Sequence, residues 1–254
     1  MLQCKSQTVV STHGARERRT PGSCRLGQGQ AMGPTELRVL SCRSQIRGLS
    51  KQELALVFQV QAVATTGIIV HLLGPAGVGK LTIACALAPR LTARVVDNHW
   101  INNPIFGLLD NDRLTPFPPE VWTKIEKIRS AVLETIAAIS RPEASFILTN
   151  ELYDDDADDR TVAAQVMDAA RRRGSPYVPV RLQCAAAELA KRTVAIERAA
   201  RLKSMDPQSA SRNARRPVLV TGSPNELTLD TTELSPAESA ERIAAHINLV
   251  RSRS

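Results

Sequence analysis

Short apolar runs alternate with amphipathic segments from residue 67 almost to the end of the chain. The runs are rich in β-branched residues, which is typical of buried strands. They occupy residues 68–73, 93–99, 144–150, 177–184 and 227–230. Strands that alternate with helices are the signature of βαβ units. The pattern therefore predicts an α/β fold, with a doubly wound, five-stranded parallel sheet flanked by helices.

The segments between and after these runs carry a helical pattern. It predicts helices at residues 79–88, 118–140, 154–174, 185–203 and 235–250. In the second of these, apolar residues recur every three or four positions. Pro89 is expected to limit the first helix, because a proline inside a helix removes a backbone hydrogen bond. Ser235 and Glu238 form a capping box at the start of the last helix.

Residues 1–66 differ from the rest in composition. They hold nine Lys or Arg and three acidic residues, whereas the remaining residues hold 24 and 22. The first fifty are rich in Arg, Ser, Gln and Gly without a sustained period, which indicates a disordered tail, a transit peptide or an extension outside the working protein. A short helix is expected at residues 51–64. Most of the net charge of +8 thus belongs to this basic tail.

Composition also excludes several classes of protein. The part from residue 67 onward is nearly neutral and aromatic residues make up 3% of the chain, so we expect no specific nucleic-acid partner. No apolar run reaches the roughly 18 residues that span a bilayer, so no membrane partner is expected. The five cysteines lack metal-ligand spacing. We therefore expect a cytoplasmic protein with free thiols, acting as a monomer or homodimer.

The sequence "GPAGVGKLT" follows the first predicted strand and opens the first predicted helix. It matches the phosphate-binding pattern G-x-x-x-x-G-K-[ST] except at its last position. In this motif backbone N–H groups and the positive end of a helix dipole bind phosphate, and the lysine reaches the β- and γ-phosphates. The nucleotide-binding residues are predicted to be Gly74, Pro75, Ala76, Gly77, Val78, Gly79, Lys80, Leu81 and Thr82.

Leu81 is the departure from that pattern, because a leucine has no hydroxyl for a magnesium ion. Thr82 lies about 100° further around the helix and is a poor substitute. Magnesium commonly keeps several waters, so phosphates, water and a strand-end acid are able to hold it. We therefore expect that the loop still binds nucleotide and that Asp97 or Thr82 contributes to the metal site.

Four features of the chain resemble the P-loop small-molecule kinases related to shikimate, gluconate and adenylate kinases. They are the loop, the strand ending "VVDNH", the basic helix with "RAARLK" and the closing "LTLDTTELSPAESAERI". The ending "GKLT" is also similar to uncharacterised ATPases described as AAA-family or shikimate-kinase-like. The resemblance covers about residues 67–250. It implies a P-loop NTPase fold with a small helical lid at about residues 198–217, the cofactors ATP and Mg²⁺, and a small-molecule acceptor.

The resemblance also implies roles for single residues. Asp97 matches the first member of the acid-x-acid pair of shikimate-type kinases, which serves magnesium, and His99 replaces the second, which holds the substrate. Asn150 and Glu151 lie at a strand end that faces the γ-phosphate or the acceptor, and Arg198 and Arg201 correspond to lid arginines. Each has a structural alternative: a helix N-cap or a loop turn for Asp97, a strand-terminal turn for Asn150 and a solvated face for the arginines. The main chain at residues 221–225 is expected to face adenine.

Two functions follow as hypotheses. The first is an ATP-dependent phosphotransferase in which Lys80, Asp97, Arg198 and Arg201 are catalytic and Asp97, His99 and Asn150 bind the hydroxylated acceptor. The second is a regulatory protein that binds or hydrolyses ATP without an acceptor. Shikimate itself is not favoured, because His99 departs from the shikimate-kinase pattern.

Overall fold

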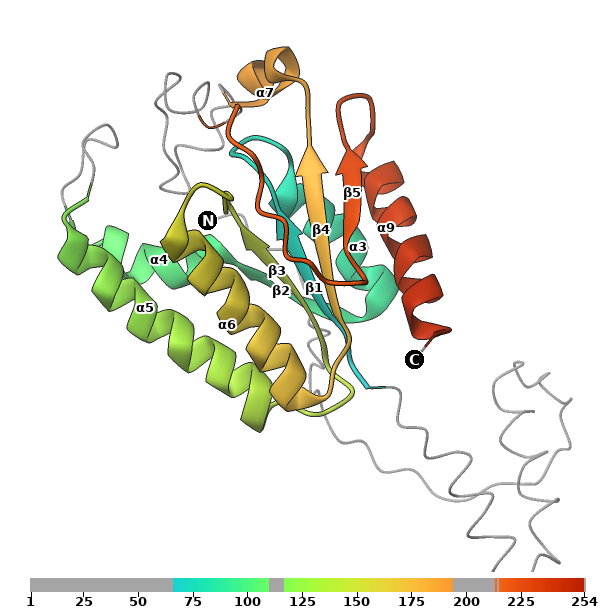
Figure 1. Ribbon diagram of the computed structural model, residues 1–254, viewed down its shortest axis with the longest axis horizontal. Helices are drawn as coiled ribbons and strands as arrows, with labels where there is room; N and C mark the ends of the chain where they lie inside the picture. The colour runs from blue at the N-terminus through green and yellow to red at the C-terminus, as the bar shows by residue number, and fades with distance from the viewer. Residues whose placement is uncertain (1–65, 110–116, 194–212, 214, 254) are drawn as a thin grey trace, which may run out of the picture. The chain divides into compact units, whose positions relative to one another are not determined.

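The five strands lie parallel in one sheet, in the order β2-β3-β1-β4-β5 (Figure 1). This computed structural model describes residues 66–109, 117–193, 213 and 215–253. The strands are β1 (Ile69–Leu73), β2 (Ala93–Asp97), β3 (Ser145–Asn150), β4 (Tyr177–Gln183) and β5 (Leu227–Asp230). β1 is central and every residue in it is buried, as expected for a strand covered on both faces. The predicted α/β class and parallel five-stranded sheet are confirmed.

Helices cover both faces of this sheet (Figure 1). They are α3 (Lys80–Leu91), α4 (Asn98–Phe106), α5 (Pro119–Glu134), α6 (Ala157–Arg173), α7 (Ala186–Thr193) and α9 (Pro236–Arg251), with a π-helical turn η1 at Thr135–Ile139. α3 and α9 pack on one face in a core that includes Val70, Leu87 and Ile243. α5, η1 and α6 cover the other face. Each such buried side chain contributes roughly 1.5–3 kcal/mol to stability.

The loop that follows β1, residues 74–80, is called the phosphate loop below. It lies at the centre of the sheet, because β1 is the central strand. β3 and β4 flank β1, and the chain crosses to one side for β2 and β3 and to the other for β4 and β5. Such a change of direction opens a crevice beyond the carboxyl ends of the strands. Leu73 of β1 lies opposite Asn150 of β3, and Asp97 of β2 lies opposite Thr149. The sheet therefore brings the ends of β1, β3 and β2 to one edge.

Several predicted boundaries were wrong. The second strand ends at Asp97 rather than residue 99, because α4 begins at Asn98. α3 continues through Pro89 to Leu91, since a proline near the last turn costs one hydrogen bond and Thr92 caps the end in a left-handed conformation. The long helix predicted to residue 140 ends at Glu134, where η1 takes over.

The caps of the last two long helices agree with the sequence pattern. Ser235 and Glu238 form the capping box of α9. α6 begins after Asp156, whose side chain accepts from the backbone of Asp158 and Asp159, and ends at Gly174 in a left-handed conformation. The predicted start at residue 154 was therefore three residues early.

Several predicted elements lie outside the described residues. They are the basic tail apart from Thr66, the helix at 51–64, the part of the basic helix beyond residue 193, and the lid at 198–217 apart from Asn213 and residues 215–217. Among the described helices, none is long and apolar enough to cross a membrane.

Candidate active site at the ends of the central strands

The phosphate loop follows β1 and packs tightly against β4. Gly74 has a φ of 153°, and a Cβ added there would lie 2.7 Å from the carbonyl oxygen of Leu182. Gly79 has a φ of 98° and is the N-cap of α3, with no side-chain hydrogen bond in that cap. Only glycine adopts such a φ without strain. The first amides of α3 are thus left to an external acceptor, as phosphate binding requires.

Lys80 folds over the loop. Its Nζ donates to the carbonyl oxygens of Gly74 at 2.6 Å and Pro75 at 2.9 Å. Its ammonium group therefore lies directly above the loop backbone. A phosphate bound by the loop would offer charged acceptors to the same group, and charge-assisted hydrogen bonds are the stronger ones. This geometry suits the predicted role of Lys80.

A residue directly after the edge strand β5 also contacts the phosphate loop. Thr231, just after β5, is buried and its hydroxyl lies 3.1 Å from the carbonyl oxygen of Gln183 and 3.4 Å from that of Val78. No sequence motif marks Thr231, and a cap of the strand was its only expected role. The segment that follows β5 therefore lies beside the phosphate loop.

The segment expected to face adenine, residues 221–225, runs to the other end of the strands. Asn225 donates to the carbonyl oxygen of Tyr177, which lies opposite Ile69 at the start of β1. The phosphate loop follows the opposite end of β1, so this expectation was wrong for Asn225. A loop that precedes a parallel strand lies at the amino ends of the sheet, whereas the phosphate loop lies at the carboxyl ends, so the predicted parallel sheet already argued against this segment.

Leu81 and Thr82 differ in environment. Leu81 is half-buried and Thr82 is exposed on the first turn of α3. The structure therefore does not bring the Thr82 hydroxyl into a buried position under the loop. Its predicted role as a magnesium ligand stays a prediction.

Asp97 is the acidic group at this edge. It is 5% exposed, and its Oδ1 accepts a 2.6 Å hydrogen bond from the hydroxyl of Thr149 on the neighbouring strand. That hydroxyl also accepts from the backbone N–H of Asn98 at 3.3 Å. By position Asp97 is the N-cap of α4, but its side chain makes no capping hydrogen bond. Asp97 is therefore the N-cap residue of α4, as the structural alternative expected, but its carboxylate caps no backbone amide.

Asn150 belongs to a buried polar network that the sequence did not reveal. Its Oδ1 lies 3.0 Å from Nε2 of His71, and Nδ1 of His71 lies 3.0 Å from the hydroxyl of Tyr177. Its Nδ2 donates to Oδ1 of Asn98 at 3.1 Å. With Asn150 accepting, His71 carries its proton on Nε2 and accepts from Tyr177.

Burial sets the charge state of this network. His71 is completely buried, and desolvation lowers its pKa from 6.5 to about 4, although the hydrogen bond to Asn150 opposes the shift. Burial also raises the pKa of Tyr177. Both groups are therefore neutral at pH 7. The only sequence signal was a single imidazole within an otherwise apolar strand.

The remaining predicted site residues divide into two groups. His99 lies on the first turn of α4, and its Nδ1 is 3.3 Å from Oδ1 of Asn103. Arg198 and Arg201 lie outside the described residues, so their roles stay predictions. Two described arginines from the same regions bind protein groups: Arg192 reaches the carbonyl oxygens after β5, and Arg216 forms a bidentate pair with Asp155.

The acidic run after β3 anchors the segment that returns from the predicted lid. Arg216 pairs with Asp155 and lies 4.1 Å above the ring of Tyr153. Glu151 accepts hydrogen bonds from the hydroxyl of Tyr153 and from Asn213. Burial raises the pKa of Asp159 to about 6, while a hydrogen bond from the Tyr153 backbone opposes that shift. Asp155 and Asp159, at the start of α6, thus bind protein groups as well as facing solvent.

No group of three or more His, Cys, Asp or Glu able to hold a metal ion occurs in the described part of the chain. Asp97 offers a carboxylate at the edge where the phosphate loop lies, and oxygen ligands are what Mg²⁺ prefers. A single carboxylate suits a magnesium ion that is held mainly by phosphate oxygens and water. Asp97 therefore fits the cofactor, and Leu81 contributes nothing to it.

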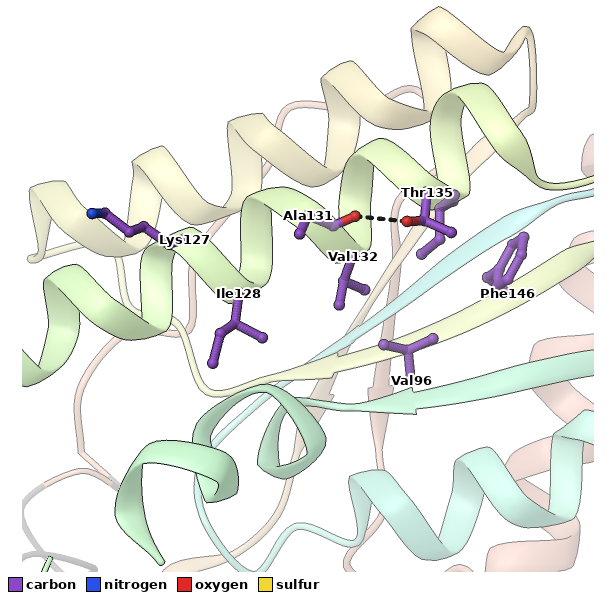
Figure 2. A pocket seen from close by; sticks show the side chains of 8 residues that line it. Val96, Lys127, Ile128, Ala131, Val132, Thr135 and Phe146 are labelled. Atoms are coloured by element: carbon purple, nitrogen blue, oxygen red, sulfur yellow. Dashed lines mark hydrogen bonds between the residues drawn. The ribbon is translucent and has the colours of Figure 1, made fainter. Parts of the chain in front are cut away.

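A separate cavity of about 540 Å³ lies along α5 (Figure 2). Ile128 and Val132 point from the helix towards Val96 and Phe146 on the strands. Its lining is almost entirely apolar and includes none of the predicted site residues. We therefore place the candidate active site at the strand ends and not in this cavity.

Comparison with known proteins gives the fold but no close relative. No protein-family model and no curated protein matches the chain. Among solved structures, a gluconokinase from Sinorhizobium meliloti is 14% identical, with a TM-score of 0.52 over 74% of this chain and 95% of that one. A sugar kinase from a Janibacter species is 17% identical, with a TM-score of 0.51 over 73% of this chain and 97% of that one. The chain therefore has the fold of the P-loop small-molecule kinases.

Proposed function

We propose that this protein is an ATP-dependent phosphotransferase that acts on a small hydroxylated acceptor. The proposal rests on one observation: a phosphate-binding motif and a buried carboxylate lie at the carboxyl ends of strands in the same sheet. A phosphate loop with Lys80 folded over it ends β1, and a buried carboxylate, Asp97, ends β2. Only β3 separates these strands. The kinase-like fold and the names of its structural neighbours, a gluconokinase and a sugar kinase, support the same reaction class.

The proposed chemistry is in-line transfer of the γ-phosphoryl group. The loop amides and Lys80 bind the β- and γ-phosphates and stabilise the charge that develops during transfer. The bond from the acceptor oxygen to γ-phosphorus forms as the bond to the β,γ-bridging oxygen breaks, and ADP leaves with that electron pair. Asp97 accepts the proton of the acceptor hydroxyl through the carboxylate oxygen that does not bond Thr149. Alternatively, Asp97 orients the acceptor while the hydroxyl proton is lost.

Bound Mg²⁺ would neutralise charge across the β- and γ-phosphates, and Asp97 is the described residue able to contact it or its water shell. Asn150 and His99 are proposed to contact the acceptor. Arg198 and Arg201 keep their predicted role of closing over the phosphates.

An acceptor screen that follows ADP release tests this proposal. We expect ADP release to depend on a small hydroxylated compound and to stop in its absence. Release at one rate whatever the acceptor would instead identify the regulatory ATPase, which no described feature favours. Absence of ATP binding would contradict both functions.

A further inference from the structure

Thr149 joins the end of β3 to the start of α4. It is 1% exposed and lies opposite Asp97 in the parallel register of β2 and β3. Its hydroxyl accepts from the backbone N–H of Asn98 at 3.3 Å and donates to Oδ1 of Asp97 at 2.6 Å. A backbone N–H only donates, so the single hydroxyl hydrogen goes to the carboxylate. The 2.6 Å distance is typical of a strong hydroxyl–carboxylate hydrogen bond.

Asp97 has the backbone of a helix cap without the side-chain bond of one. It is the N-cap residue of α4, with a φ of −71° and a ψ of 135°. Aspartate is among the preferred N-cap residues, because its carboxylate accepts from the amide of the second or third helical residue. The third helical residue here is Trp100. The carboxylate of Asp97 makes no such bond and reaches Thr149 instead.

Asp156 shows what an aspartate does at another helix start in this chain. As the N-cap of α6 its Oδ1 accepts from the backbone N–H of Asp158 at 3.0 Å and of Asp159 at 3.4 Å. Asp97 and Asp156 both have an extended backbone, so they differ in the direction of the side chain.

The Thr149 hydroxyl replaces part of the missing cap. A helix start leaves four backbone amides without a partner in the helix. The first of these in α4 belongs to Asn98, and it donates to the Thr149 hydroxyl. Asn150 holds the same residue through its side chain, because its Nδ2 donates to Oδ1 of Asn98. Two neighbouring residues of β3 thus hold the start of α4 while the Asp97 carboxylate is directed elsewhere.

From the comparison of the two aspartates we infer that Thr149 is a positioning residue: its hydroxyl keeps the Asp97 carboxylate from capping α4 and holds it for phosphoryl transfer. Oδ1 is bonded to Thr149, so Oδ2 is the oxygen that takes the proton of the acceptor hydroxyl. The Thr149 hydrogen stays on its own oxygen throughout. The catalytic consequence rests on the proposed phosphotransferase function, whereas the orientation of Asp97 does not.

The variant Thr149→Val tests the orientation in the ligand-free protein. It removes the hydroxyl and keeps the branched shape, so we expect the Asp97 carboxylate to rotate and cap α4. Hydrogen exchange at the Trp100 amide should then be about tenfold slower than in wild type, and a crystal structure should show the rotation directly. Thr149→Ala is a second variant with the same expected result.

Thr149→Ser keeps the hydroxyl and should keep the wild-type orientation and exchange rate. Thr161→Val, on an exposed position of α6, is the matched control and should change neither. A carboxylate of Asp97 that caps α4 in wild type, or that keeps its wild-type direction in Thr149→Val and Thr149→Ala, overturns the inference.

Activity should follow this orientation. With the compound that gives the fastest ADP release in the acceptor screen, we expect Thr149→Val to lower kcat about 30-fold. KM for that compound and ATP affinity should stay within threefold, and Thr149→Ser should keep at least a third of the wild-type kcat.

The variant Asp97→Asn separates positioning from a purely structural role. In its background Thr149→Val should lower kcat less than twofold further, because the carboxylate that Thr149 positions is already absent. An equal loss in both backgrounds would contradict the positioning role.

The proposed function and the role of Thr149 fail in different measurements. If wild type binds no ATP, or releases no ADP with any acceptor, the proposed function fails, while hydrogen exchange and the ligand-free structures still test the direction of Asp97. If transfer occurs and Thr149→Val keeps its kcat, the proposed function stands and only the positioning role fails.

Discussion

The two sides of the candidate active site are built in different ways. The side proposed to bind nucleotide is a continuous stretch of backbone, from Gly74 to Lys80, in which glycine conformations and one helix end supply the hydrogen-bond donors. The side proposed to bind the acceptor is a set of side chains from separate elements: Asp97 bonds Thr149 and Asn98 bonds Asn150, each pair 52 positions apart. The first depends on local sequence, whereas the second exists only when β2, β3 and α4 are in register.

This difference predicts how each side responds to substitution. A change on the nucleotide side should affect every reaction of ATP. A change on the acceptor side should affect transfer while ATP binding persists.

The largest effect is expected from Lys80→Ala. Loss of the ammonium group removes a charge from the phosphates in the ground state and in the transition state, so turnover should fall about 1,000-fold and ATP affinity about tenfold. Steady-state ADP release and ATP titration measure the two values. Lys127→Ala, on an exposed position of α5 beside the apolar cavity, is the control and should resemble wild type. Unchanged ATP affinity in Lys80→Ala would contradict the phosphate-loop assignment.

Asp97→Asn should separate the two sides most clearly. The asparagine still accepts the hydrogen bond from Thr149, so the fold and ATP affinity should change less than threefold. Turnover should fall about 100-fold, because the group that takes the acceptor proton is lost. Asp168→Asn, a surface partner of Arg171, is the control. Equal losses of ATP affinity and turnover would place Asp97 on the nucleotide side instead.

His71→Gln tests the buried network through the pH dependence of stability. The pKa of His71 falls from 6.5 to about 4 on folding, so the unfolded chain binds more protons between these values. Its contribution is complete above pH 6.5 and is lost as pH falls towards 4, by about 3 kcal/mol in total. The free energy of unfolding from urea titrations at pH 4 and pH 7 measures this.

Asp159 changes the free energy of unfolding with pH in the direction opposite to His71. The pKa of Asp159 is raised to about 6, so its contribution falls as pH rises from about 4 to 6. The informative quantity is therefore the difference between wild type and His71→Gln at each pH. We expect the wild-type protein to lose more stability than the variant between pH 7 and pH 4. Parallel curves would show that His71 does not titrate in this way.

The smallest effect is expected from Leu81→Ser. A hydroxyl at this position restores the usual magnesium ligand of the motif, so the Mg²⁺ concentration for half-maximal turnover should fall a few-fold. ATP affinity should change less than twofold, because the loop amides and Lys80 dominate it. Leu249→Ser, on an exposed position of α9, serves as the control. A larger change in ATP affinity than in magnesium dependence would contradict this assignment.

The sequence predicted those features that depend on neighbouring residues. Apolar runs marked all five strands, and the spacing of Gly74, Gly79 and Lys80 marked the loop, because each depends on period or on local backbone conformation. Asp97 was found as an acid at the end of a predicted strand and through the resemblance to known kinases.

Features that depend on tertiary register were missed. His71 is one residue in an apolar strand, and its role becomes visible only when Tyr177 and Asn150 lie beside it. α4 was missed because "NHWINNPIF" contains a proline and little helical period. The segment expected to face adenine precedes β5, and Asn225 in it lies at the amino ends of the parallel strands, opposite the phosphate loop; this error came from not applying the predicted strand direction.

The central claim is that phosphate passes from ATP to a hydroxyl group at the edge shared by Lys80 and Asp97. The most direct measurement follows the γ-phosphate of labelled ATP into products, with wild type and Asp97→Asn compared under an acceptor that supports turnover. We predict label in the acceptor for wild type and about 100-fold less in the variant. Label found only in inorganic phosphate, at equal rates in both proteins, would contradict the account.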